Sequence, residues 1–200
     1  MQALPSAAPA LAFPPPRADR TDLPAPPEGR GDGLDLPASL AQRGIGLRAA
    51  RADDIGWLRT LYRELRAHEF APMGWPPQAL AAFLDQQFAM QHLHYVRYYE
   101  RADFLVVEHE GAPVGRIYLQ RAAPEHLLVD ISLDARARGS GIGAGLVRWA
   151  QDEAHARGRG MRLHVEHGNH GARRLYERLG FVLTENLPTH AAMRWESDLR

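Results

Sequence analysis

Apolar residues recur at helical spacing in two segments of the first half of the chain. The first segment follows Asp53, and its apolar positions stand three or four residues apart, as one face of an α-helix requires. These positions are Ile55, Leu58, Leu61, Tyr62 and Leu65. After a Pro-rich loop at residues 72–77, the same period returns at Leu80, Phe83, Leu84 and Phe88. The pattern therefore predicts two consecutive amphipathic helices.

Short runs of β-branched and aromatic residues predict the strands. They are Ile45–Ala49, Phe104–Glu108, Val114–Gln120, Leu127–Leu133, Met161–Val165, Phe181–Leu183 and Ala191–Trp195. Glu110-Gly111 joins the second and third strands as a hairpin. Two further helices are predicted at Ile142–Arg157 and Gly171–Arg178, the latter closed by Gly180 at its C′ position. The order β-αα-βββ-α-β-α-ββ indicates an α+β fold.

The first 43 residues follow neither period. Nine of the 15 prolines of the chain lie in residues 1–40, among alanines and few large apolar side chains. This composition predicts a disordered, partly polyproline-like tail from Met1 to Arg43 and a globular domain from Gly44 to Arg200. A targeting peptide is disfavoured, because no basic stretch precedes a long apolar run. The chain also has no run of 18 apolar residues, so no membrane span is predicted.

Two residue types are missing from the composition. All 24 basic residues are arginine, and the cysteine count is zero. The absence of cysteine excludes Cys-His catalysis and thiolate zinc sites, and the absence of lysine excludes Schiff-base catalysis and a phosphate loop of the Gly-Lys-Ser/Thr type. The formal net charge is zero, which gives no electrostatic reason to expect binding to nucleic acid or to an anionic membrane.

A glycine-rich loop precedes the helix predicted at Ile142. Glycines there let backbone N–H groups approach an anion, and the helix dipole favours negative charge, so the loop suits a phosphate. A glycine-rich turn without a ligand is the alternative. Gly139-x-Gly141-x-x-Ala144 also matches the dinucleotide fingerprint. That interpretation is disfavoured, because five residues separate Leu133 from the first glycine and only 34 residues follow Glu166, where an acidic ribose ligand would stand.

Two motifs together resemble one known family. Arg138-x-x-Gly141-x-Gly143 is similar to the (Gln/Arg)-x-x-Gly-x-(Gly/Ala) signature of the GNAT family of acetyl-CoA-dependent N-acetyltransferases. Downstream, residues 163–181 are similar to the second block of that family, in which a strand is followed by Asn-x-x-Ala-x-x-Leu-Tyr-x-x-x-Gly-Phe. The order of the elements also matches over about 150 residues. The resemblance implies a mixed, mostly antiparallel sheet flanked by helices, whose central strands splay to bind acetyl-CoA.

The resemblance also implies which residues bind acetyl-CoA. Backbone N–H groups of the loop would hold the pyrophosphate, with Arg138 adding charge nearby. The loop residues are Gly139, Ser140, Gly141, Ile142, Gly143 and Ala144. The strand at Ile131–Leu133 is expected to carry a bulge, to splay from the Met161 strand and to bind pantetheine through its free backbone. The N–H of Leu133 would polarise the thioester carbonyl, and Asn169 would bind the pantetheine arm, cap its helix, or do both.

Two residues are candidates for catalysis. In the family, a tyrosine at the position of Tyr176 donates a proton to the departing thiolate, and a phenol with a pKa of about 10 is protonated at neutral pH. Packing in a core stripe is the alternative for this side chain. Asp130 shares a strand face with Ser132 and is the candidate base; a hydrogen-bonded structural aspartate is its alternative. Leu127 stands where some protein-lysine acetyltransferases have a glutamate, which disfavours a histone-type activity.

The other candidate features are weaker. His164, His167 and His170 are regularly spaced, but His164 and His167 point to opposite faces of a strand, so no metal site is predicted. Aromatic side chains of the early helices could line an acceptor pocket or pack in the core. They are Trp75, Phe83, Phe88, Tyr95, Tyr98 and Tyr99.

We therefore expect a cytoplasmic, bacterial N-acetyltransferase that moves an acetyl group from acetyl-CoA directly to a primary amine in a ternary complex. The acceptor amine belongs to a small molecule or a protein. Without cysteine, an acetyl-cysteine intermediate is impossible, which favours direct attack by the acceptor. The alternative is a module of the same fold that binds acyl-CoA without turnover.

Overall fold

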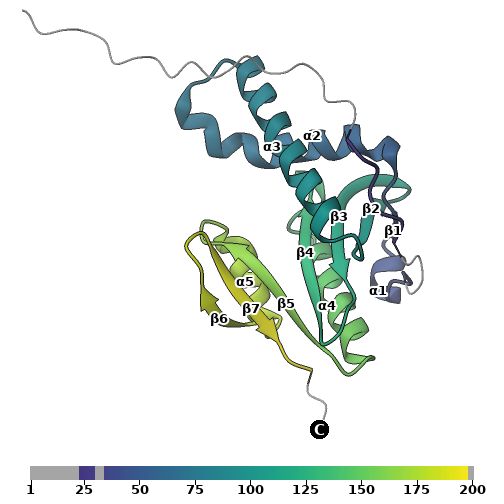
Figure 1. Cartoon of the computed structure of the whole chain (residues 1–200). Coiled ribbons are helices and arrows are strands. Elements are labelled where there is room, and N and C mark those ends of the chain that lie inside the picture. The colour runs from purple at the N-terminus through teal and green to yellow at the C-terminus, as the bar shows by residue number, and fades with distance from the viewer. Residues whose placement is uncertain (1–22, 30–33, 198–200) are drawn as a thin grey trace, which may run out of the picture.

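A computed structural model describes residues 23–29 and 34–197. Seven strands form one sheet in the order β1-β2-β3-β4-β5-β7-β6 (Figure 1). They are β1 (Ile45–Ala49), β2 (Asp103–His109), β3 (Ala112–Gln120), β4 (Glu125–Leu133), β5 (Gly160–Glu166), β6 (Val182–Asn186) and β7 (His190–Trp195). All neighbours pair antiparallel except β4 and β5, which are parallel. The predicted mixed, mostly antiparallel sheet is confirmed.

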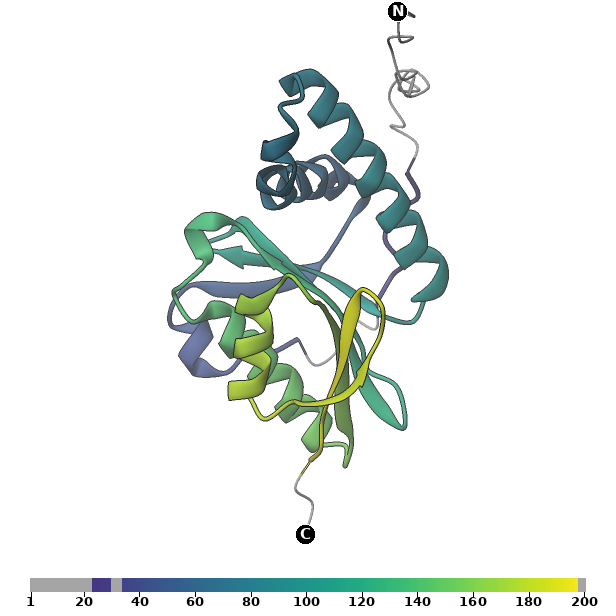
Figure 2. The same cartoon turned by 90° about the vertical axis from the view of Figure 1, so that its left-hand side faces the viewer.

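Helices cover both faces of this sheet. They are α1 (Ala38–Ala41), α2 (Ile55–Arg66), α3 (Pro77–Tyr98), α4 (Ile142–His155) and α5 (His170–Arg178), with 3₁₀ turns η1 (Ala52–Asp54), η2 (Ala67–Met73) and η3 (Ala135–Ala137). Figure 2 shows α2 and α3 on one side of the sheet and α4 and α5 on the other. No helix of the described ranges combines the length and apolar character that crossing a bilayer requires.

The central strands are buried on both faces. In β2, Leu105 and Val107 belong to the main core beneath α4 and α5, whereas Phe104 and Val106 belong to a second cluster that packs against α3. Alternate residues of a strand point to opposite faces, so a strand covered on both sides reads as a continuous apolar run. This explains why four consecutive residues of β2 are apolar and fully buried.

Two turns follow directly from local residue chemistry. Glu110 and Gly111 both have positive φ values, 52° and 79°, as a two-residue hairpin turn of type I′ requires. At the end of α5, Gly180 has a φ of 84°. Its N–H donates to the Glu177 carbonyl at 3.1 Å, and the Phe181 N–H donates to the Tyr176 carbonyl at 3.0 Å. These two bonds form a Schellman motif, and the predicted C′ position of Gly180 is confirmed.

The sheet opens between β4 and β5. Only residues 125–128 of β4 pair with β5, and the pairing stops at Leu128 opposite Leu163. On the other side of β4, the register with β3 shifts so that Val129 is an extra, bulged residue. The predicted splay along Ile131–Leu133 is present, but the bulge lies at Val129 rather than within that range. A bulge bends its strand, and here it directs the end of β4 away from β5.

The packed chain begins before Gly44, which corrects the predicted boundary of the tail. Leu40 of α1 is buried in the main core, and Leu23 is buried in the cluster formed by α2 and α3. Both are isolated apolar residues in a Pro-rich sequence, so periodicity cannot detect them. Each packs against helices that lie elsewhere in the sequence. Residues 1–22 and 30–33 of the predicted tail lie outside the described residues.

Candidate active site

A cavity of about 650 Å³ lies at the opening between β4 and β5. Residues from several elements line it, among them Tyr95 from α3, Asp130 from β4, Glu166 from β5, Asn169 before α5 and Tyr176 within it. The cavity therefore lies where β5 no longer pairs with β4 and so gives its backbone no hydrogen-bond partners. Both catalytic candidates chosen from the sequence meet in this one place.

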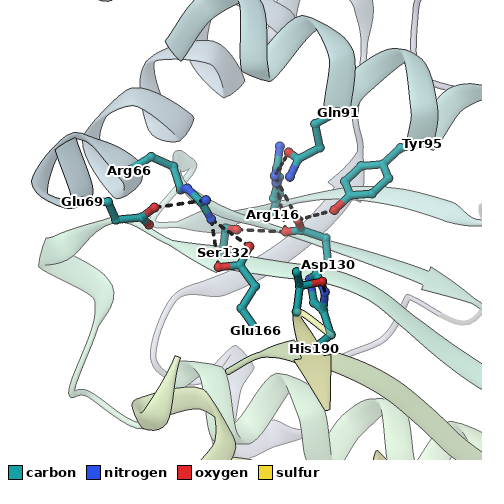
Figure 3. A network of polar contacts seen from close by, with 10 residues as sticks. Arg66, Glu69, Gln91, Tyr95, Arg116, Asp130, Ser132, Glu166 and His190 are labelled. Atoms are coloured by element: carbon teal, nitrogen blue, oxygen red, sulfur yellow. Dashed lines mark hydrogen bonds and ion pairs between the residues drawn. The ribbon is translucent and has the colours of Figure 1, made fainter. Parts of the chain in front are cut away.

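Asp130 is held in a network of hydrogen bonds (Figure 3). Arg116 donates from Nε to Oδ1 at 3.1 Å and from Nη2 to Oδ2 at 3.0 Å. The Tyr95 hydroxyl donates to Oδ2 at 3.1 Å, and the Ser132 hydroxyl donates to Oδ1 at 2.9 Å. A carboxylate offers about four acceptor positions, and these four bonds use them. Of the two sequence-based interpretations of Asp130, the hydrogen-bonded aspartate is the arrangement seen here.

The ladder between β3 and β4 brings Arg116 to Asp130. Arg116 is opposite Ser132 in register, and Tyr118 is opposite Asp130, so Arg116 is a diagonal neighbour of Asp130 on the same face. The guanidinium is almost fully buried and also donates to Gln91 of α3 at 2.8 Å. Burial by itself would lower the pKa of Arg116, but the Asp130 carboxylate outweighs it and raises the pKa. Arg116 is therefore a permanent buried cation.

Arg116 belongs to no motif, although the sequence holds one signal of its role. The residue is a lone charge inside the apolar run Val114–Gln120, where a cation is stable only with a partner. Tyr95 was one of six aromatic candidates for the pocket; it and Tyr99 line the cavity. Trp75 and Phe83 instead pack edge to face, with ring centroids 5.2 Å apart.

Tyr176 lies on α5, a helix that is capped at both ends. The Asn169 side chain caps α5 by accepting from the Ala172 N–H at 3.1 Å, and the Schellman motif holds the Tyr176 carbonyl. The ring packs against Phe181 with centroids 5.8 Å apart and belongs to the main core. The side chain also lines the cavity, so core packing and access to the site coexist. Burial first, and then the negative charge of Asp130, raise the pKa of Tyr176 and keep the phenol protonated.

The glycine loop presents the N-terminus of α4. Gly139 and Gly141 have φ values of 71° and 84°, which favour glycine. The first helical bond of α4 runs from the Gly145 N–H to the Gly141 carbonyl at 2.9 Å, so the N–H groups of Ile142, Gly143 and Ala144 precede the helical ladder. Such N–H groups, together with the helix dipole, suit a phosphate.

Side chains brace this loop from within. Arg138 donates from Nε to the Leu133 carbonyl at 2.9 Å, which ties the loop to the end of β4. The Ser140 hydroxyl donates to the Ala137 carbonyl at 2.7 Å. Asp134 caps the short turn η3 by accepting from the N–H groups of Arg136 and Ala137. The loop is thus a preformed structure rather than a loose connection.

Arg66 and Glu166, which both line the cavity, form an ion pair (Figure 3). Arg66, at the end of α2, donates from Nη1 to both oxygens of Glu166 on β5 at 3.0 and 3.2 Å. Its Nη2 lies 3.1 Å from Glu69. The pair joins the end of α2 to the end of β5, and its side chains are half-exposed. Sequence periodicity gave no signal for it, because 100 positions separate Arg66 from Glu166.

Histidine and carboxylate side chains do not assemble into a metal centre in the described ranges. No group of three or more that could hold a metal ion is found within residues 23–29 and 34–197.

Comparisons with known proteins agree with this geometry. The acetyltransferase (GNAT) family matches residues 58–181, more than half of the chain. The PaiA N-acetyltransferase of Thermoplasma acidophilum, solved in complex with coenzyme A, superposes with a TM-score of 0.60 at 18% identity, covering 76% of this chain and 98% of its own. The ribosomal-protein-S18-alanine N-acetyltransferase of Escherichia coli gives a TM-score of 0.54 at 22% identity, covering 78% and 96%.

The yncA structure of Salmonella typhimurium, which contains acetyl-CoA, gives a TM-score of 0.51 at 20% identity and covers 78% of this chain and 96% of its own. A comparison with curated proteins finds no match. At these identities the solved structures establish the fold, and the family match covers both motifs and the splayed strands. The chain therefore belongs to the acetyltransferase (GNAT) family.

Proposed function

We propose that the protein transfers an acetyl group from acetyl-CoA to a primary amine by direct attack in a ternary complex. The observation that carries this proposal is the cavity at the opening between β4 and β5, which Tyr176 of α5 and Asp130 of β4 both line. Cysteine is absent from the chain, so an acetyl-cysteine intermediate has no residue to form on. Family membership and neighbours solved with coenzyme A or acetyl-CoA support the choice of donor.

The residues of the loop and of β4 fit coenzyme A. N–H groups from Gly139 to Ala144 suit the pyrophosphate, and Arg138 adds positive charge. Beyond Leu128, β4 does not pair with β5, so the backbone of Ile131 and the N–H of Leu133 are available on that side to an extended pantetheine arm, as in strand addition. Asn169 stands at the same opening. Bound acetyl-CoA would supply the activated acetyl thioester.

Tyr176 is the proposed general acid. Its phenol is protonated across the neutral range because burial and Asp130 raise its pKa. As the C–S bond breaks, Tyr176 donates its proton to the departing sulfur and so stabilises the leaving group. The capped ends of α5 and the packing of the ring against Phe181 hold the Tyr176 side chain in place, which favours preorganised catalysis.

Asp130 is the proposed base, acting through Tyr95. Its four acceptor positions are filled, so direct contact with an acceptor ammonium would require a donor to leave. The Tyr95 hydroxyl lines the cavity and keeps acceptor lone pairs of its own. In the proposed relay an acceptor N–H bond breaks as its proton joins the Tyr95 oxygen, and the original Tyr95 proton passes to Asp130. The charge of Arg116 holds Asp130 in position for this transfer.

The acceptor is a primary amine of a small molecule or of a protein. One structural neighbour is named for acetylation of an alanine of ribosomal protein S18, which is a protein amine. The present cavity has aromatic walls from α3 and charged residues at its mouth. These features are compatible with either kind of acceptor, so the panel of test amines must include both.

Thiol release from acetyl-CoA in the presence of an amine panel tests the proposal. The wild type is expected to release thiol with at least one amine, and Tyr176→Phe is expected to lower kcat by about 10²-fold or more, the usual contribution of general acid catalysis. Tyr98→Phe is the matched control, because Tyr98 is an exposed tyrosine of α3. Thermal stabilisation by acetyl-CoA without turnover on any amine would favour the acyl-CoA-binding module instead. If acetyl-CoA causes no thermal shift, both functions fail.

A further inference from the structure

The segment that precedes β1 contacts the glycine loop and the helix behind it. Arg43 donates from Nη2 to the carbonyl oxygen of Ser140 at 2.8 Å, across 97 positions of sequence. Leu40, in the same segment, lies directly on α4: a Cβ added at Gly145 would stand 2.8 Å from its Cδ2. Leu40 is only 2% exposed. Both contacts come from outside residues 58–181, the part of the chain that matches the family.

The bond from Arg43 has a definite consequence for the loop. The Ser140 carbonyl and the Gly141 N–H belong to one planar trans peptide, in which they point in opposite directions. A guanidinium that holds the carbonyl on one side therefore directs the Gly141 N–H to the other side. Gly141 carries this N–H at positive φ, and Gly139 one residue before Ser140 also has positive φ; a glycine backbone rotates easily there, so an external restraint has an effect.

The bond is also charge-assisted. A hydrogen bond from a cation to a carbonyl is shorter and stronger than one between neutral groups, and it polarises the peptide so that its N–H becomes a better donor. Leu40 fixes the start of the segment by burial, so Arg43 is anchored three residues from a core contact. The guanidinium adds positive charge beside the N-terminus of α4 as well.

We propose that Arg43 is a positioning residue for the diphosphate of coenzyme A: it orients the Ser140–Gly141 peptide so that the Gly141 N–H faces the anion. The inference rests on the proposed function, because it requires the loop to bind the coenzyme. It extends the coenzyme site to a segment outside the family match, the turn that follows α1. The ligand group concerned is the diphosphate, not the 3′-phosphate or the pantetheine arm.

Binding of three ligands to the full-length protein tests this assignment. Coenzyme A has the diphosphate and the 3′-phosphate, dephospho-coenzyme A keeps only the diphosphate, and pantetheine has neither. Isothermal titration gives Kd for the first two, and ligand-observed NMR gives Kd for pantetheine. The variant is Arg43→Met, which keeps most of the aliphatic stem and removes the donors. Arg101→Met, at an exposed arginine in the turn between α3 and β2, is the matched control.

For Arg43→Met we expect Kd to rise about tenfold for both coenzyme A and dephospho-coenzyme A and to stay unchanged for pantetheine. The unliganded Tm should match that of the wild type, because Arg43 is exposed. Loss confined to coenzyme A would place Arg43 on the 3′-phosphate and overturn the proposal. An equal loss of affinity for all three ligands would indicate a general structural role of Arg43, and no loss of affinity would show that it has no role. Either result would overturn the proposal. Failure of the wild type to bind coenzyme A would instead defeat the proposed function.

Discussion

Replacing Arg116 by methionine should destabilise the fold more than any loss of a surface ion pair. The Arg116 side chain is 4% exposed and the side chain of its partner Asp130 is 11% exposed. Methionine keeps an unbranched apolar chain of similar length, so the change removes charge and donors with little loss of volume. What remains is a buried carboxylate that keeps only Tyr95 and Ser132 as donors.

The magnitude follows from the bonds that disappear. Arg116 gives two hydrogen bonds to Asp130 and one to Gln91. Removing one partner of a buried ion pair costs about 3–5 kcal/mol, because the other charge stays desolvated and uncompensated. For a chain of this size that corresponds to a fall in Tm of roughly 6–20 °C. Arg116→Met combined with Asp130→Leu should recover most of the loss, since an apolar replacement of the whole pair is often close to neutral.

Urea unfolding followed by far-UV circular dichroism gives the free energy of unfolding for each variant, and an unchanged m-value supports a common two-state transition. Arg173→Met is the matched control: it breaks the exposed i,i+4 pair with Glu177, which should contribute about 0.3–0.5 kcal/mol. The reasoning is refuted if Arg116→Met costs less than about 1 kcal/mol. It is also refuted if the double variant loses the sum of the two single losses, since the charges would then be uncoupled.

Two further predictions concern packing and pH. Gly115→Ala should lower stability by about 1–3 kcal/mol in the same urea assay, because the new Cβ would lie 2.6 Å from the Ser132 carbonyl oxygen and would also meet the Leu133 side chain; an alanine variant as stable as the wild type would contradict it. For His92, burial lowers the pKa of the imidazole despite its hydrogen bond to the Pro24 carbonyl. The contribution of neutral His92 to stability is therefore complete above a pH of about 6.5 and is lost as the pH falls through the folded-state pKa. Between about pH 7.5 and pH 5 the wild type should therefore lose more unfolding free energy than His92→Gln, and equal losses would exclude this residue as the cause.

Local chemistry determined much of the fold. The Glu110-Gly111 turn, the Gly180 cap and the apolar run of β2 each follow from residues within a few positions of one another, so their geometry was predictable from the sequence. The two motifs of the acetyltransferase (GNAT) family are also continuous segments, and the family match covers both. Backbone conformation depends mainly on neighbouring residues, which is why these features need no tertiary information.

Tertiary structure decided the chemistry inside the site. Sequence alone identified Asp130 but could not pair it with Arg116, because that pair depends on the register between β3 and β4. It also placed the bulge two residues too late, since only the pairing with β3 shows which residue of β4 is extra.

The long-range contacts show the same limit. Arg66 meets Glu166, and Leu40 fills the space above Gly145, only after separate elements have packed together. A single charge or a single leucine carries no period, so nothing in its neighbourhood indicates its partner. Periodic patterns specify helices and strands, whereas the packing of those elements sets the partners of isolated side chains. At this site such a partner, Arg116, holds Asp130, which is proposed to act as the base.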